Sequence, residues 1–277
     1  MKICRTFWLA VLLFPFMTVL AQTNMVEADT VPQRHTTESV NMFGVGGVFL
    51  LDTYLSPEKY NGVELRFTNQ TTRRREGSLW STQLTTHGYL NYAESRGDDG
   101  TVMGGLASYS FARHYNWMLC DGRLHLQAGG LASANIGFNY CVRNQNNPAQ
   151  MRLFAHLAPS AVATWHFHGW RRPMALRYEV EMPLVGVMFS PNFGQSYYEI
   201  FSRGNYDHNV VVTTPFNAPS LRHMLSLDVS WGRHTLRVGY MGDYQQSHVN
   251  ELKFHSYSHL LMVGYLRNFR ISDIIKR

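Results

Sequence analysis

The 277-residue chain is poor in charged residues, poor in cysteine, and without a long apolar run beyond its first 21 residues. Charged side chains make up only 16% of it, against roughly 25% in an average soluble domain, so few groups are available to coat a water-facing surface. A hydrophobic content of 45% excludes an intrinsically disordered chain. No run of 18 or more apolar residues follows residue 21, which excludes a membrane-spanning helix there. The mean hydropathy of −0.23 is also too polar for a helical bundle in lipid.

The three cysteines, Cys4, Cys120 and Cys141, form no metal-binding pattern, because no CxxC or CxxH spacing occurs among them. We therefore expect no metal site and no cofactor. The basic clusters at 73–75 and 171–172 lack interleaved recognition residues and suit membrane phosphates better than a nucleic-acid partner.

Residues 1–21 have the organisation of a secretory signal peptide. Lys2 and Arg5 precede an apolar run that Pro15 interrupts, and small residues stand before a cleavage site after Ala21. The run is too short for a spanning helix, which needs about 20 residues. The sequence therefore predicts an exported protein, with 22–40 as a short periplasmic extension.

Beyond the leader, apolar and polar residues alternate over unusually long stretches. The clearest stretch, Arg123 to Tyr140, alternates over 18 residues, whereas strands of soluble proteins run about 5–6 residues and a bilayer-spanning strand needs about 9–11. Ten candidate strands follow, near 43–54, 61–68, 79–93, 101–119, 123–140, 151–167, 175–188, 221–231, 234–245 and 257–271. The predicted fold is all-β, a transmembrane antiparallel up-and-down β-barrel over 41–271 with a 272–277 tail. The even number ten suits such barrels, and eight strands is the alternative count.

The links between these strands predict which end of the barrel faces the periplasm. Short links, including the hairpin turn Asp121-Gly122, would lie on the periplasmic side, where both termini are expected. Longer links at 55–60, 94–100, 143–150, 189–220 and 246–256 would face outward. The aromatic and apolar content of 189–220 predicts that it caps the barrel mouth. In this topology Cys120 and Cys141 lie at opposite ends of one strand, so we expect two free thiols.

Tryptophan placement gives an independent indication of a membrane barrel. All five tryptophans beyond the leader fall within or beside predicted periplasmic turns, and aromatic rings collect at the boundary between water and lipid. The predicted periplasmic aromatic girdle comprises Trp80, Trp117, Trp165, Trp170 and Trp231.

With these alternating strands, links and tryptophans, the chain resembles small outer-membrane β-barrels of Gram-negative bacteria. The segment His259 to Phe269 (HLLMVGYLRNF) is similar to the closing strand that the barrel insertion machinery reads, and Leu51 to Gly62 (LDTYLSPEKYNG) resembles the opening strand of an uncharacterised barrel family, a domain of unknown function. The resemblance covers 41–271. It implies a bacterial outer-membrane location, contact with lipid and lipopolysaccharide, and no known activity, and we expect a monomer.

The polar face of the strands predicts a lumen lined by charges. Because a buried charge is tolerated only when it is partnered, we expect these groups to pair and plug a narrow lumen, with a charge-lined ion passage as the alternative. The predicted lumen residues are Glu64, Arg66, Arg177, Glu179, Glu181, Arg222, Asp228 and Arg237, accompanied by His114, His125 and Asp243.

The preferred function is therefore a non-enzymatic barrel, structural or handling small solutes. One alternative is an outer-membrane hydrolase, because omptin proteases are similar ten-stranded barrels with an external carboxylate pair and an Asp-His pair. By that resemblance His208 would be the general base, Asp207 its orienting partner, and Asp98 with Asp99 would position the attacking water. A second alternative is a secreted, soluble, lipocalin-like binder.

Overall fold

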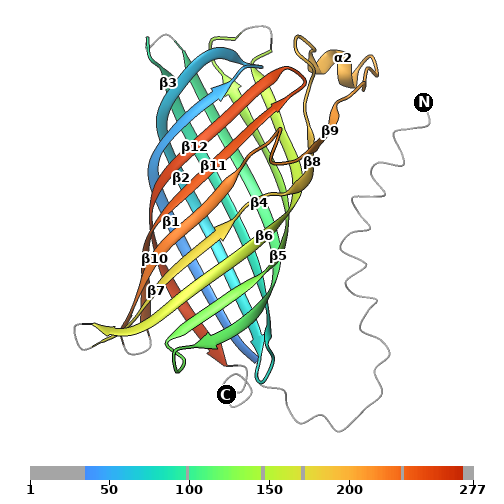
Figure 1. Ribbon diagram of the computed structural model, residues 1–277. Coiled ribbons are helices and arrows are strands. Elements are labelled where there is room, and N and C mark those ends of the chain that lie inside the picture. The colour runs from blue at the N-terminus through green and yellow to red at the C-terminus, as the bar shows by residue number, and fades with distance from the viewer. Residues whose placement is uncertain (1–34, 98–99, 145–146, 170–171, 232–233, 271–277) are drawn as a thin grey trace, which may run out of the picture. The chain divides into compact units, whose positions relative to one another are not determined.

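Because side chains alternate between the two faces of a strand, the apolar and polar alternation of this chain produces strands with one apolar and one polar face. The computed structural model describes residues 35–97, 100–144, 147–169, 172–231 and 234–270 (Figure 1). Its elements are β1 (His35–Asp52), β2 (Ser56–Arg75), β3 (Trp80–Ser95), β4 (Thr101–Leu119), β5 (Leu124–Cys141), β6 (Ala149–Gly169), β7 (Arg172–Glu181), β8 (Val185–Phe189), α2 (Tyr197–Phe201), β9 (Val210–Thr213), β10 (Leu221–Trp231), β11 (His234–Val249) and β12 (Leu252–Arg270).

Consecutive long strands pair antiparallel, β7 pairs with β10 past the short strands β8 and β9, and the pairing of β1 with β12 closes the sheet into a barrel. Within the described residues the sheet has twelve strands, of which β8 and β9 extend from β6, so that ten strands form the ring. The predicted all-β, antiparallel, ten-stranded barrel is confirmed, and the alternative count of eight strands is wrong. Strands such as β2 and β6, with 20 and 21 residues, exceed the length needed to cross a bilayer.

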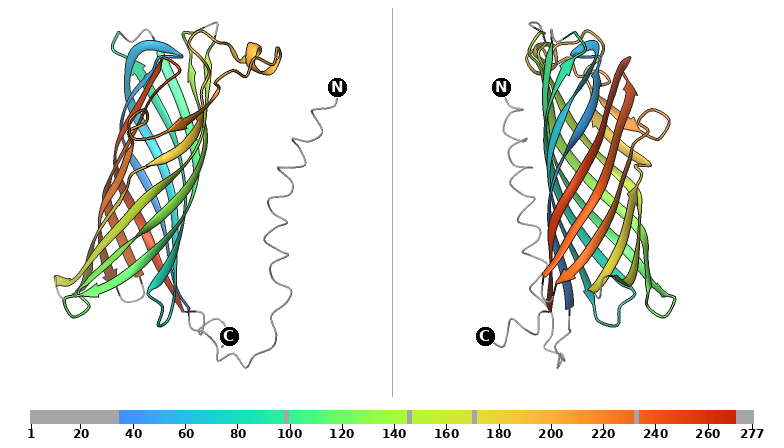
Figure 2. Two further views of the ribbon diagram at one scale, coloured as in Figure 1. Left: turned by 45° about the vertical axis from the view of Figure 1, so that its right-hand side comes forward. Right: turned by 90° about the vertical axis from the view of Figure 1, so that its left-hand side faces the viewer.

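The two ends of the barrel differ. The start of β1 and the end of β12 lie together at one end, called the terminal end, and α2 lies at the other, called the loop end (Figure 2). The predicted leader 1–21 lies outside the described residues. Residues 35–40, predicted to belong to a periplasmic extension, instead begin β1 and pair with both neighbouring strands. Except for Val40 these residues are polar, so they carry no apolar alternation that would have predicted a strand.

Several links differ from their predicted form, and residues 56–60 of the predicted link 55–60 belong to β2. The predicted strand 175–188 is broken into β7 and β8 around Pro183, which has no N–H to donate to the ladder. The predicted outer loop 246–256 is a two-residue turn, Asn250-Glu251, whose φ angles of 51° and 61° match a tight hairpin. Its other polar residues belong to β11 and β12, not to a loop.

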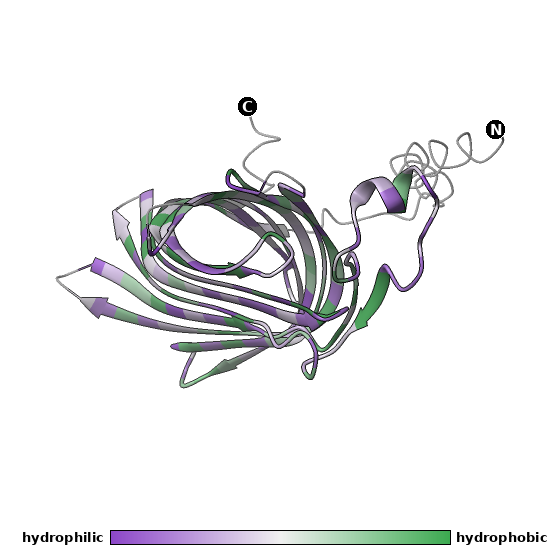
Figure 3. Ribbon diagram, turned by 90° about the horizontal axis from the view of Figure 1, so that it is seen from above, coloured by the Kyte–Doolittle hydropathy of each residue, from purple (hydrophilic) through white to green (hydrophobic). Residues whose placement is uncertain are grey.

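Residues 190–209 contain α2, the single helix among the described residues, which Ser196 and Glu199 cap reciprocally. This helix is too short to cross a membrane. Seen along the barrel, α2 lies beside the ring of strands and not across it (Figure 3). The prediction that this link caps the barrel mouth is therefore wrong, and the link docks on one side of the rim, where Tyr54 donates a hydrogen bond of 3.0 Å to the Gln195 carbonyl.

Candidate functional site

The interior of the barrel is the candidate functional site, and its central charges pair across the lumen. Arg66 on β2 contacts Glu64 at 2.6 Å and Asp243 on β11 at 2.5 Å. Arg222 on β10 contacts Glu181 at 2.8 Å and Asp243 at 3.5 Å. These five residues form one network, the upper charge network, which joins β2, β7, β10 and β11.

A second group of charges lies closer to the terminal end. Arg237 contacts Asp228 at 2.6 Å and Glu38 at 3.3 Å, while Arg177 pairs with Glu179 on its own strand. We call these five residues the lower charge network. Glu38 was missed at the sequence level because it lies within the predicted extension 22–40, where no strand was expected.

One hydrogen-bonded contact spans the full width of the lumen. Gln70 on β2 donates to the two carboxylate oxygens of Glu179 on β7, at 3.1 and 3.0 Å. In the ring order β1 to β7 and then β10 to β12, β2 and β7 are five positions apart in a ring of ten. The two side chains therefore meet from opposite walls, and no open channel passes between them.

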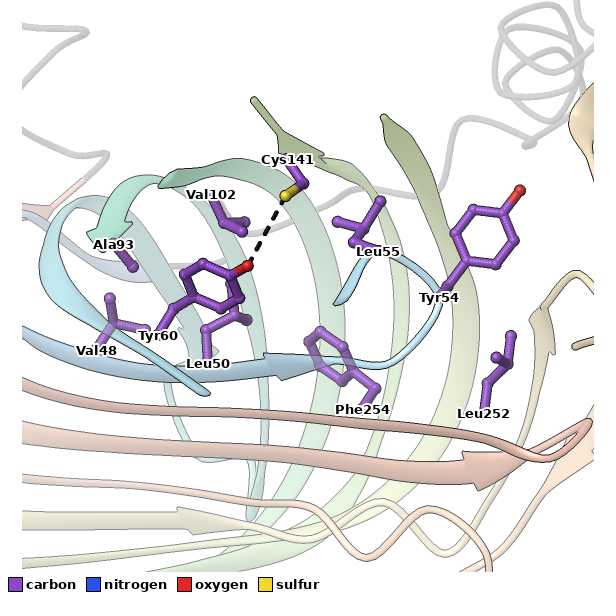
Figure 4. Close-up of a cluster of buried hydrophobic side chains, with 10 residues drawn as sticks. All are labelled: Val48, Leu50, Tyr54, Leu55, Tyr60, Ala93, Val102, Cys141, Leu252 and Phe254. Atoms are coloured by element: carbon purple, nitrogen blue, oxygen red, sulfur yellow. Dashed lines mark hydrogen bonds between the residues drawn. The ribbon is translucent and has the colours of Figure 1, made fainter. Parts of the chain in front are cut away.

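Apolar side chains also fill the interior, on either side of these charges. One cluster of inward-facing residues lines the wall made by β1 and β10 to β12, and includes Met42, Met241 and Met262. A larger cluster fills the loop end, where Tyr60 lies beside Cys141, its hydroxyl oxygen 3.8 Å from the sulfur (Figure 4). Cys141 is buried and Cys120 is exposed, and both are free, as predicted. The interior is thus polar at its centre and partly apolar elsewhere, which alternation alone did not predict.

The sequence analysis also missed two charged residues near the loop end, Asp52 and Arg152. Asp52 accepts a hydrogen bond of 2.9 Å from Asn139, which reaches it from β5. The Arg152 guanidinium lies 3.4 Å from the centre of the Phe254 ring. Both residues lie within the predicted strands 43–54 and 151–167 and have the inward parity of those strands, so parity alone could have found them.

The cavities inside the barrel are small. One of about 50 Å³ lies among the charge networks and is lined by residues including Gln70, Glu179 and Arg222. Another of about 60 Å³ lies nearer the loop end, beside Arg152 and Gln245. Each cavity has room for a few water molecules only.

Of the residues of the hydrolase alternative, the structure describes Asp207 and His208. Asp207 and His208 contact each other at 2.7 Å, but their side chains are 78% and 81% exposed on the link after α2. Asp98 and Asp99 lie outside the described residues. A pair as exposed as this one offers no water-excluded environment for general-base chemistry.

The described tryptophans of the predicted girdle all lie at the terminal end, on the outside of the wall. Trp80, Trp117, Trp165 and Trp231 are 42–52% exposed. Arginines accompany two of them, with Arg113 at 5.0 Å from the Trp80 ring and Arg172 at 4.3 Å from the Trp231 ring. Trp170 lies outside the described residues.

Comparisons with known proteins give similar solved structures and a family, but no activity. Similar solved structures include the outer membrane protease OmpT from Escherichia coli (6% identity, TM-score 0.44, covering 90% of this chain and 99% of that one). They also include the transport unit of the autotransporter AIDA-I from Escherichia coli (8% identity, TM-score 0.42, 92% and 95%) and the translocator domain of the autotransporter NalP from Neisseria meningitidis (10% identity, TM-score 0.38, 92% and 93%). The comparison with curated proteins found no match. The model of a family described as "Protein of unknown function (DUF3316)" matches residues 7–274, nearly the whole chain, and the chain belongs to that family.

Proposed function

We propose that this protein is a non-enzymatic outer-membrane barrel whose lumen is closed to the free passage of ions and solutes. The observation that carries the proposal is the contact between Gln70 and Glu179, which meet from opposite walls. The upper charge network and the small size of the interior cavities support it. Removing water from paired charges is tolerated here because each carboxylate of the two networks contacts an arginine.

The outer surface supports the membrane placement. Outward positions in the middle of the strands carry large apolar side chains, such as Phe43, Leu65 and Leu261, which are 59–69% exposed. A soluble barrel would hide such a belt from water. The tryptophans at the terminal end suit a lipid boundary, so we assign that end to the periplasm and the loop end to the outside. Lipid and lipopolysaccharide then surround a monomer inserted by the barrel insertion machinery.

The test is conductance of the purified full chain in planar bilayers, after gel migration with and without boiling has shown that the barrel is folded. We expect no stable single-channel conductance from the wild type. A variant in which Arg66, Gln70 and Glu179 are all replaced by alanine should conduct, because three groups that bridge the lumen are removed. Alanine at the outward-facing Arg113 serves as the matched control and should stay closed. Stable conductance from the wild type would refute the closed lumen.

Cell fractionation tests the location independently. Recovery in the outer-membrane fraction is expected, and a soluble periplasmic product would support the lipocalin-like alternative instead. Hydrolase activity that disappears in His208→Ala would overturn the non-enzymatic assignment, since that substitution removes a side chain that touches no part of the barrel wall.

A further inference from the structure

The wall of the barrel is interrupted in its loop-end half. β10 pairs with β7 as far as Arg222 and with β11 as far as Leu221. Closer to the loop end than Leu221, β9 pairs only with β8, and residues 245–249 of β11 pair only with β12. Among the described strands, β9 and β11 are therefore each left with an unpaired edge. We call this interruption the seam.

The seam is crossed by residues 214–220, which include Pro215 and Pro219. Proline has no N–H, so this segment cannot form a regular ladder with β11. In the described structure two hydrogen bonds join it to β11, from His248 N to Asn217 O at 2.7 Å and from Gln246 N to Ser220 Oγ at 3.2 Å. A wall held by two bonds opens at a smaller free-energy cost than the continuous ladders elsewhere in the barrel.

Two cavities lie on either side of this segment. The inner one, of about 60 Å³, is lined by residues that include Arg152, His156 and Gln245. The outer one, of about 460 Å³, is lined mainly by apolar and aromatic groups, among them Met182, Pro215, Pro219, Tyr244 and Tyr257. Ser220, Leu221 and Gln246 line both cavities, so a partition one residue thick separates them.

The inner cavity holds an arginine without a salt-bridge partner in the part of the chain that the structure describes, and its other lining residues include Glu181 and Asp243, which pair with Arg222. Arg152 is 8% exposed, and within the described residues no carboxylate oxygen lies within 4.0 Å of it. Its Nη2 donates to Gln245 at 3.3 Å, while its Nη1 has no hydrogen-bond partner. The Nε2 atom of His156, which lines the same cavity, is also buried without a partner. A buried cation with unused donors is costly unless an anion binds there.

We propose that the seam is a lateral binding site for a single-chain amphiphile with a carboxylate head group, such as a long-chain fatty acid. The carboxylate enters the inner cavity and accepts hydrogen bonds from Arg152, while the hydrocarbon chain lies in the outer cavity. The small inner cavity, of about 60 Å³, favours the compact carboxylate over a larger phosphodiester head group. The inference rests on the membrane placement proposed above, but not on the closed lumen.

Binding is tested on the full chain in nanodiscs of zwitterionic lipid, with empty nanodiscs subtracted. Hexadecanoate should bind saturably, whereas hexadecanol lacks the charge and butyrate lacks the chain, and both should bind at least about tenfold more weakly. Arg152→Met should weaken hexadecanoate binding by about 10- to 100-fold, and Arg152→Lys should retain part of the affinity. Arg113→Met, on the outer wall, is the matched control. Equal binding of hexadecanol, or unchanged binding by Arg152→Met, overturns the proposal.

Arg152→Met is expected to fold, because it removes a cation without a close carboxylate partner, and gel migration without boiling checks this. A second variant tests the route. Ser220→Cys with Gln246→Cys, in a Cys120→Ser background, locks the seam when oxidised and should abolish binding until the disulfide is reduced. The control pair Leu225→Cys with Tyr240→Cys lies in a regular ladder and should not respond. Unchanged binding by the oxidised seam variant rules out entry through the seam. A conducting wild type would refute the closed lumen while leaving these results interpretable.

Discussion

Gln70 and Glu179 meet across the lumen at 3.0–3.1 Å, although 109 residues separate them in the chain. Glu179 is held at the same time by Arg177, its neighbour on the inward face of β7. The carboxylate therefore connects its own wall to the opposite one. This contact converts a ring of strands into a filled interior and underlies the closed state that we propose.

Removing Arg66 should destabilise the barrel strongly. Its guanidinium contacts Glu64 and Asp243, and all three side chains are at most 3% exposed. Arg66→Ala leaves buried carboxylates without this partner, so we expect a loss of about 3–5 kcal/mol in the free energy of unfolding. Urea unfolding in lipid vesicles measures it. Arg113→Ala, on the outer wall, should change the same quantity by less than about 1 kcal/mol, and equal effects would contradict the role of Arg66.

Barrel closure should be sensitive to a side chain at Gly46 and not at Gly47. A Cβ atom at Gly46 would lie 1.8 Å from the His259 carbonyl oxygen on β12, whereas at Gly47 the nearest atom is 3.9 Å away. Gly46→Ala forces β1 and β12 apart and should cost about 1–3 kcal/mol or more. Gly47→Ala is the matched control. The fraction that migrates as a folded barrel without boiling reports the difference, and similar migration of both variants would count against this register.

The turn between β11 and β12 offers a stabilising substitution. Glu251 has a φ of 61°, a left-handed conformation that costs a non-glycine residue about 1–2 kcal/mol. Glu251→Gly should therefore raise the urea midpoint. Asn250→Gly should not, because the Asn250 amide donates to the carbonyls of Ser190 and His208, at 3.1 and 3.0 Å, and those bonds would be lost. A lowered midpoint in Glu251→Gly would show that the side chain matters more than the backbone strain.

Docking of the α2 link on the rim should weaken at high pH. Burial raises the pKa of Tyr197 from about 10 to about 12, and its hydroxyl oxygen accepts a hydrogen bond of 2.7 Å from Met151 N. Burial favours the neutral phenol, so the pKa is higher in the folded state than in the unfolded state. The stability that the buried Tyr197 side chain contributes is therefore complete below pH 10 and is lost as the pH rises through 12. Hydrogen exchange of residues 190–209 should accelerate over that window. Tyr197→Phe should exchange faster at neutral pH without this dependence, and an unchanged pH profile in the variant would exclude Tyr197.

The pattern of residues predicted much of this fold because alternation is a local property. The strand 124–141 and the tryptophans Trp80 and Trp231 were all located by parity and turn signals. Predicted ends were less accurate at 35–40 and 246–256, since strands that pass the lipid boundary no longer need an apolar face. The break at Pro183 could have been read from the sequence, as proline cannot donate to a ladder.

The sequence alone determined that this protein forms an antiparallel barrel with charges facing inward, because each of these features depends on neighbours two residues apart. Only the tertiary structure decided which charges meet, that methionines share the lumen with them, and that the wall is interrupted beside Arg152. Those relationships depend on strand register and ring closure, which bring together residues as far apart as Arg66 and Asp243. Alternation specifies the face of each residue but not its partner across the lumen.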